Sequence, residues 1–178
     1  MAKGYLQVHG LEYNEKFIPI TRMDYIRLFF SIAALKKWEV HHMDVKSDFP
    51  HGDLEEEIYM RQLEGYTEYS SLVCKLRKYI YGLKKSPRAW YAKMDAFLLP
   101  QKFMRCKSDC NVYMQQKRGF LLFIVLYVDD LLITSGSAAR LRGIKSALSE
   151  AFSMTDLGML KRFIGLEVNE KKLGIMIT

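Results

Sequence analysis

The chain has few cysteines and no long hydrophobic run, and both shortages exclude classes of protein. Its three cysteines, Cys74, Cys106 and Cys110, lack the paired short spacings of a zinc site, and no secretory leader precedes them. This pattern favours a reducing, intracellular setting. The longest apolar run, Phe120 to Val128, is far shorter than the ~20 residues that a membrane-spanning helix needs. We therefore expect a soluble protein.

Histidines and flexible linkers are also scarce. His41 and His42 are adjacent, so on a strand they would point to opposite faces, and a shared metal site is not expected. The chain has no internal repeat, low-complexity tract or linker rich in glycine, proline and serine. Its 178 residues suit one well-buried core better than two full domains. We therefore expect one continuous globular unit.

Acidic residues are outnumbered, and one segment has none of them. The chain carries 27 lysines and arginines against 20 aspartates and glutamates, a formal net charge of +7, which favours a polyanionic partner. Between Glu68 and Asp95 there is no acidic residue, and Lys93 is the last of seven cations. Tyrosines and Trp90 lie among them and suit stacking on bases, although core packing is the simpler interpretation of Trp90. We predict nucleic-acid binding by the other six cations, Lys75, Arg77, Lys78, Lys84, Lys85 and Arg88.

Hydrophobic periodicity predicts three helices. The first spans about 21–37, with Thr21 and Asp24 as a capping box. The second spans 86–99, because a serine followed by proline is typical of a helix start. The third has one apolar face between residues 141 and 152.

Apolar and β-branched runs predict the strands. They lie at 38–46, 58–60, 72–76, 120–128, 131–134, 161–168 and 173–177. The larger elements then follow the order strand, helix, strand, strand, helix, strand, which is the split βαβ arrangement of ferredoxin-like folds. We therefore expect an α+β fold with an antiparallel sheet. A right-handed crossover would make its first two large strands, 38–46 and 120–128, run parallel.

Three aspartates are expected to meet at one edge of that sheet. Asp129 and Asp130 join two apolar runs as a hairpin turn, and the parallel alignment brings Asp44 to the same edge. Converging carboxylates repel one another and lose hydration, at a cost of several kcal/mol, and divalent cations offset that cost. Oxygen ligands in an open site suit magnesium, and two such ions can activate an attacking hydroxyl and stabilise a leaving pyrophosphate.

A solvated hairpin tip is the simpler interpretation of Asp129 and Asp130, because aspartate is common in turns. Against it, Asp-Asp is not the Asn-Gly or Asp-Gly pair that tight two-residue hairpins prefer, and the flanks are apolar on both sides. The acidic cluster at residues 53–57 is interpreted as a solvated turn or face.

Several motifs resemble one known family. The hairpin reads Tyr127-Val128-Asp129-Asp130, similar to the Tyr-x-Asp-Asp box of reverse transcriptases. Further stretches resemble the Ty1/copia retrotransposon branch in the same order and extend over nearly the whole chain. They are AKGY at 2–5, HMDVKS at 42–47, GDLEEEIYM at 52–60, YGLKKSPRAW at 81–90, DLGMLK at 156–161 and FIGLE at 163–167. The resemblance implies an RNA-directed DNA polymerase, a nucleotidyltransferase that copies a template.

The resemblance also implies a fold and its parts. It implies a polymerase palm with the split βαβ antiparallel sheet, together with partial fingers. Residues 1–38 and 52–86 would be the fingers, residues 39–51 and 87–160 the palm, and residues 161–178 a primer-grip hairpin.

Site residues follow by the same resemblance. Asp44, Asp129 and Asp130, with the backbone of Val45, would hold two Mg²⁺ ions, with Mn²⁺ as an alternative. Nucleotide binding would involve Phe49, as an aromatic gate against a ribose 2′-hydroxyl, and Gly82. The primer grip would be formed by Phe163, Ile164, Gly165 and Leu166.

The resemblance implies partners and a location. They would be an RNA or DNA template with its primer, deoxynucleoside triphosphates and the remaining regions of a Pol polyprotein, with no membrane. The location would be the cytoplasm, including virus-like particles.

Three departures from the family pattern put activity in doubt. Asp48 stands where the family has a small alanine, and a carboxylate there would repel a triphosphate. Pro50 and His51 replace a leucine and an asparagine, and proline removes a backbone donor. A further finger strand upstream, and thumb and RNase H regions downstream, are not found in the chain, so we expect a fragment with impaired activity. The alternatives are a non-catalytic nucleic-acid-binding remnant and a decaying reading frame whose product folds poorly.

Overall fold

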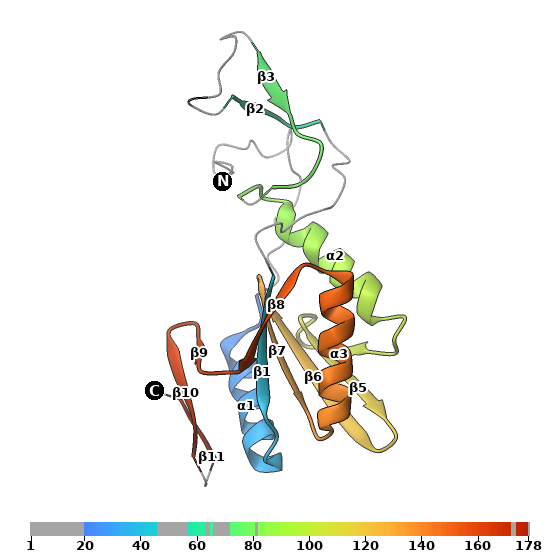
Figure 1. Ribbon diagram of the computed structural model, residues 1–178, viewed down its shortest axis with the longest axis vertical. Coiled ribbons are helices and arrows are strands. Elements are labelled where there is room, and N and C mark those ends of the chain that lie inside the picture. Colours follow the sequence, from blue (N-terminus) through green and yellow to red (C-terminus); the bar gives the residue numbers. More distant parts are fainter. Residues whose placement is uncertain are drawn as a thin grey trace. The chain divides into compact units, whose positions relative to one another are not determined.

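A computed structural model describes residues 20–45, 57–62, 65, 72–80, 82–171 and 174–177 (Figure 1). Contacts divide the chain into two compact units, one of residues 1–18 and 47–94 and the other of residues 19–46 and 95–178. Helices and antiparallel sheets are both present, so the expected mixture of α and β structure is confirmed.

The second unit is built on a six-stranded sheet in the order β4-β5-β6-β7-β1-β8, with every neighbouring pair antiparallel. Its strands are β1 (Val40–Val45), β4 (Met104–Arg105), β5 (Val112–Lys117), β6 (Phe120–Tyr127), β7 (Asp130–Ser135) and β8 (Met154–Met159). The run β6-β7-β1-β8 has the strand order of a split βαβ unit. Since β1 and β6 are both antiparallel to β7, they run parallel to each other, as predicted.

The helices α1 and α3 lie on opposite faces of this sheet (Figure 1). On one face α1 (Met23–Lys36) buries Ile26, Phe29, Phe30 and Ala33 against Val40, Val125 and Leu132. On the other face lies α3 (Ala138–Ala151), whose buried residues are Leu141, Ile144 and Leu148, as the predicted stripe requires. The first helix begins differently from the prediction. Arg22 is its N-cap, and the Thr21 hydroxyl donates to the Leu126 carbonyl at 2.8 Å, so the capping box was wrong and Thr21 fastens the start of α1 to β6.

The last strand of the split βαβ unit was also assigned wrongly. The strand that pairs with β1 is β8, whereas the predicted strand 161–168 belongs to a separate three-stranded sheet. That sheet consists of β9 (Arg162–Phe163), β10 (Leu166–Lys171) and β11 (Gly174–Ile177). Ile164 and Gly165 have positive φ, 50° and 76°, and this turn separates β9 from β10. The two-residue strand β4 and the six-residue strand β5 were not predicted.

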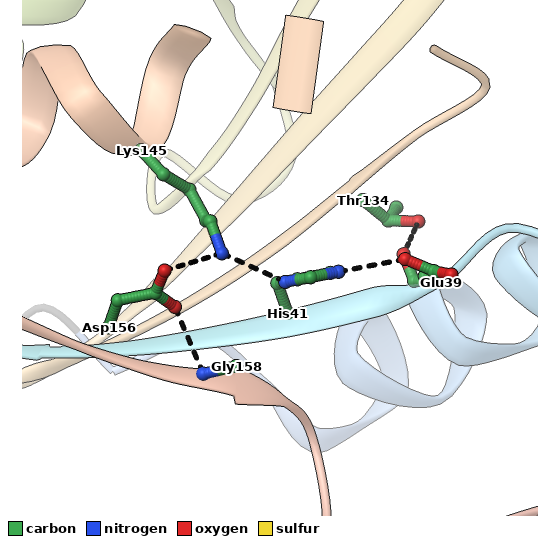
Figure 2. A network of polar contacts seen from close by, with 6 residues as sticks. All are labelled: Glu39, His41, Thr134, Lys145, Asp156 and Gly158. Atoms are coloured by element: carbon green, nitrogen blue, oxygen red, sulfur yellow. Dashed lines mark hydrogen bonds and ion pairs between the residues drawn. The ribbon is translucent and has the colours of Figure 1, made fainter. Parts of the chain in front are cut away.

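A polar network fastens α3 to the strands β1 and β8 (Figure 2). The Lys145 ammonium donates to Asp156 Oδ2 at 2.6 Å and to His41 Nδ1 at 3.0 Å. His41 then donates through Nε2 to Glu39 Oε2 at 3.0 Å. Burial opposes ionisation of Asp156, but the hydrogen bonds from Lys145 and from the Gly158 amide lower the pKa of Asp156. The network therefore favours the charged carboxylate.

The described part of the first unit is a two-stranded sheet followed by a helix. Strand β2 (Tyr59–Arg61) pairs with β3 (Val73–Lys75), and α2 (Ser86–Leu98) starts in this unit and ends in the other. A small core forms from Ile58, Tyr79 and Leu83. The helix begins at Ser86 as predicted, and the Ser86 hydroxyl donates to the Ile80 carbonyl at 2.8 Å. None of the helices in the described ranges is both long and apolar enough to cross a membrane.

Candidate active site

The hairpin between β6 and β7 carries the aspartate pair, but its turn lies one residue earlier than predicted. Tyr127 pairs with Asp130, so Val128 and Asp129 form the two-residue turn and Asp130 is the first residue of β7. Val128 has a φ of 54°, which glycine would adopt without strain and which costs a β-branched residue roughly 1–3 kcal/mol. The turn is therefore held in this shape by its surroundings.

The three aspartates converge as the sequence predicted. Asp44, near the end of β1, is the cross-strand partner of Asp130, and such partners share one face of the sheet. The Val45 amide donates to the Asp129 carbonyl at 3.1 Å, which ties the turn to the end of β1. One sheet edge thus carries three carboxylates from two strands and a turn.

Their charges oppose one another. Burial, as the largest cause, and the charges of Asp44 and Asp130 together raise the pKa of Asp129 to about 6. Burial also raises the pKa of Asp44, as does the charge of Asp130, while His42 lowers it. Each of these two carboxylates is therefore harder to ionise than an exposed aspartate.

This edge fits a divalent cation in its chemistry. Asp129 Oδ1 is buried and has no hydrogen-bond partner among the described residues. A buried carboxylate oxygen of this kind is costly unless a cation or a donor reaches it. As the side chains stand, no group of three or more histidine, cysteine, aspartate or glutamate side chains in the described ranges is arranged to hold a metal ion. The three carboxylates lie near one another, but in this arrangement of side chains they do not form a complete coordination site.

A histidine that the sequence analysis did not assign contacts the site. His42 Nε2 lies 2.6 Å from Asp130 Oδ1. The expectation that His41 and His42 lie on opposite faces of β1 holds, since His41 contacts Lys145 from α3. The missed signal was the spacing: His42 is two residues before Asp44, and alternate residues of a strand share a face.

The predicted primer-grip residues lie beside the same face. Phe163 is buried, and its ring stands edge-on to the rings of His42 and Tyr127. Ile164 is 41% exposed and forms the turn with Gly165, and Leu166 begins β10 opposite Phe163. The Phe163 ring is therefore buried beside the aspartates, while the turn that follows it in the chain is exposed to solvent.

The predicted nucleic-acid-binding cations belong to the first unit. Lys75, Arg77, Lys78 and Arg88 are exposed, and Lys84 and Lys85 are half-buried. Lys75 forms an ion pair with Glu57, so part of its charge is already compensated. Gly82 has a φ of 99° in a turn, a conformation that favours glycine. Phe49, Asp48, Pro50 and His51 lie outside the described residues.

Comparison with known proteins decides the family. The whole chain, residues 1–178, matches the family described as "Reverse transcriptase (RNA-dependent DNA polymerase)". The chain belongs to the reverse transcriptase family. This reverse transcriptase chain is 40% identical, over 171 residues, to the "Retrovirus-related Pol polyprotein from transposon TNT 1-94" of Nicotiana tabacum. The resemblance read from the motifs is thereby confirmed.

Two further relatives agree with this assignment. Over 180 residues the chain is 36% identical to the "Retrovirus-related Pol polyprotein from transposon RE2" of Arabidopsis thaliana. Over 134 residues, 74% of the chain, it is 30% identical to the "Putative transposon Ty5-1 protein" of Saccharomyces cerevisiae, of which it covers 44%. The match covers 94% of the chain but 13% of the tobacco polyprotein, and all of the chain but 12% of the Arabidopsis one. No solved structure matches the chain.

Proposed function

We propose that this reverse transcriptase chain carries the polymerising site of a Ty1/copia-type Pol polyprotein and performs RNA-directed DNA synthesis. The observation that carries the proposal is the half-buried Asp129, whose Oδ1 lacks a partner among the described residues and whose pKa is raised to about 6 beside Asp44 and Asp130. A protein gains nothing in stability from crowding three carboxylates at one edge. A reaction that requires bound cations accounts for the gathering of these three carboxylates.

In this proposal Asp44, Asp129, Asp130 and the Val45 carbonyl hold two Mg²⁺ ions, or Mn²⁺ in their place. When bound, the two cations activate the primer hydroxyl and stabilise the leaving pyrophosphate. The carboxylates themselves must be ionised, and burial keeps competing water away from Asp129. The hairpin turn, fastened to β1 by the Val45 amide, fixes the position of Asp129 relative to Asp44.

We assign the parts of the fold accordingly. The sheet that carries the aspartates, within residues 39–51 and 87–160, is the palm, and residues 161–178 are the primer-grip hairpin. Residues 1–38 and 52–86 were expected to be fingers, but we count α1 with the palm because it packs on the sheet that carries Asp44.

The substrates follow from the same proposal. A template with its primer would contact the basic stretch between Lys75 and Arg88, and deoxynucleoside triphosphates would bind near Phe49 and Gly82. The remaining Pol polyprotein would supply further regions, in an intracellular setting. Exposure of four of the six basic side chains supports the contact with phosphates.

Primer extension on poly(rA) with oligo(dT) tests the proposal. The chain is expected to extend the primer only with Mg²⁺ or Mn²⁺, and Asp129→Asn is expected to lower the rate at least about a thousandfold, since several kcal/mol of charge stabilisation would be lost. Asp24→Asn is the matched control, because Asp24 is exposed on α1, where it forms an ion pair with Arg27 at 3.8 Å. Equal rates for wild type and Asp129→Asn would refute the proposal.

A second function deserves a test because of Asp48. A carboxylate beside the expected nucleotide gate would leave a protein that binds nucleic acid without copying it. In that case filter binding to primer–template would weaken steeply with salt, would survive Asp129→Asn, and no extension would appear even in Asp48→Ala. Extension that appears or rises in Asp48→Ala would instead assign the defect to that one side chain.

A further inference from the structure

His42 lies beside the three aspartates and contacts one of them. It lies on β1 opposite Leu132, on the face that also carries Asp44 and Asp130. Its side chain is 14% exposed, while that of Asp130 is 34% exposed. The 2.6 Å contact from His42 Nε2 to Asp130 Oδ1 therefore joins a well-packed ring to a more accessible carboxylate.

The imidazole also contacts an aromatic ring. Phe163, which is 2% exposed, lies edge-on to His42 at a centroid distance of 6.1 Å and an angle of 90°. Phe163 in turn lies at 5.5 Å and 73° from Tyr127, the residue that pairs with Asp130. Rotation of the His42 ring would break its contact with Phe163, so this contact helps to hold the Nε2 atom facing Asp130.

The chemistry of the contact sets its direction. An ionised carboxylate only accepts hydrogen bonds, so His42 Nε2 carries the hydrogen and donates it to Asp130 Oδ1. This bond restrains the rotamer of a side chain at the start of β7 that would otherwise sample several positions. It also leaves Oδ2 of Asp130 available to a cation.

We infer that His42 is a positioning residue, which holds Asp130 through Oδ1 so that the carboxylate presents its other oxygen to a divalent cation. This inference rests on the proposed function, because it requires a cation at the aspartate edge. Groups that hydrogen-bond to metal-ligating side chains typically change metal affinity 10–100-fold when they are removed. Phe163 has a supporting role, since it orients His42.

Binding of Mn²⁺ to the full chain, followed by electron paramagnetic resonance of free Mn²⁺ at one fixed pH, tests the inference without requiring activity. His42→Gln and His42→Met form a matched pair, because the two side chains have similar length and volume but only glutamine donates a hydrogen bond. We expect His42→Met to weaken Mn²⁺ binding about 10–100-fold and His42→Gln to stay within about threefold of wild type. Phe163→Leu, which keeps an apolar side chain but removes the ring, is expected to weaken binding to an intermediate degree.

The outcomes separate the two proposals. If Asp129→Asn binds Mn²⁺ as well as wild type does, the metal site itself fails and the role of His42 fails with it. If Asp129→Asn weakens binding but His42→Met does not, only the positioning role is refuted. Thermal unfolding of each variant identifies any that does not fold. Should His42→Met be among them, wild-type affinity in a folded Phe163→Leu variant overturns the inference and weakened affinity supports it.

Discussion

Replacing Asp129 by asparagine is expected to stabilise the metal-free protein, and by more at neutral than at acidic pH. The pKa of Asp129 is about 6 in the folded chain, against 3.8 for an ordinary aspartate. Because the folded pKa is the higher one, the folded state holds the proton more tightly, and ionisation costs stability as the pH rises through this window. Asparagine cannot ionise, so the Asp129→Asn protein does not lose this stability as the pH rises.

The magnitude follows from the two pKa values. Each pKa unit is worth about 1.4 kcal/mol, so the cost is about 1 kcal/mol at pH 4.5 and approaches about 3 kcal/mol at pH 7.5. The advantage of Asp129→Asn should therefore grow by about 2 kcal/mol between these conditions. For a chain of this length that is a change of roughly 4–8 °C in the difference between the two melting temperatures.

Thermal unfolding in EDTA at both pH values measures this difference, with Asp24→Asn as the control. Comparing variants at each pH cancels the titrating groups that do not interact with Asp129, whereas Asp44 and Asp130 interact with its charge and belong to the measured effect. A difference between Asp129→Asn and wild type that stays constant with pH would refute the reasoning, because it would mean that Asp129 titrates alike in the folded and unfolded chain. Adding Mg²⁺ at pH 7.5 should then raise the melting temperature of wild type and leave that of Asp129→Asn nearly unchanged.

Two other substitutions test the surroundings of the site. Asp156→Asn should have the opposite sign: the pKa of Asp156 is lowered in the folded chain, so urea unfolding should show a loss of about 0.5–1 kcal/mol at pH 7 that disappears as the pH falls through that lowered pKa. An unchanged urea midpoint at pH 7 would mean that the Lys145 contact contributes nothing. Gly136→Ala should lower the melting temperature, because a Cβ atom there would lie 2.9 Å from the Trp38 ring, and overpacking costs about 1–3 kcal/mol. A Gly136→Ala protein as stable as wild type would show that the Trp38 ring moves aside freely.

The parts of the fold that could be predicted are those in which the buried positions carry apolar residues at a regular spacing in the sequence. The stripe of α3 and the apolar runs of β6 and β7 are buried in the structure where the pattern required it. The approach of Asp44 to the aspartate pair followed from the handedness of one crossover, which does not depend on exact strand ends. That geometry was therefore accessible without any structure.

The errors have a common physical cause, which is that pairing partners determine the structure at those positions. Strand β8 is mostly exposed or half-buried and contains a glycine, so its pattern is weak, and its pairing with β1 is what defines it. Threonine is common at helix N-caps, but the Thr21 hydroxyl instead donates to the buried carbonyl of Leu126 on β6. The turn at Val128 contradicts local preference, because φ is positive at a β-branched residue. Contacts across the sheet decide all three.

The irregular pairing of β1 with β8 has a consequence for how the site tolerates change. His42 pairs with Gly158 but the next residue, Met43, pairs with Asp156, so Leu157 is an extra residue on β8 with no partner on β1. On its other side β1 keeps continuous register with β7, from Val40 opposite Thr134 to Asp44 opposite Asp130. The irregularity is thus confined to the pairing of the outer strand β8, and the face on which Asp44 lies is set by the regular pairing of β1 with β7. A residue inserted or removed at this bulge would change the pairing of β8 and leave the register of β1 with β7 unchanged.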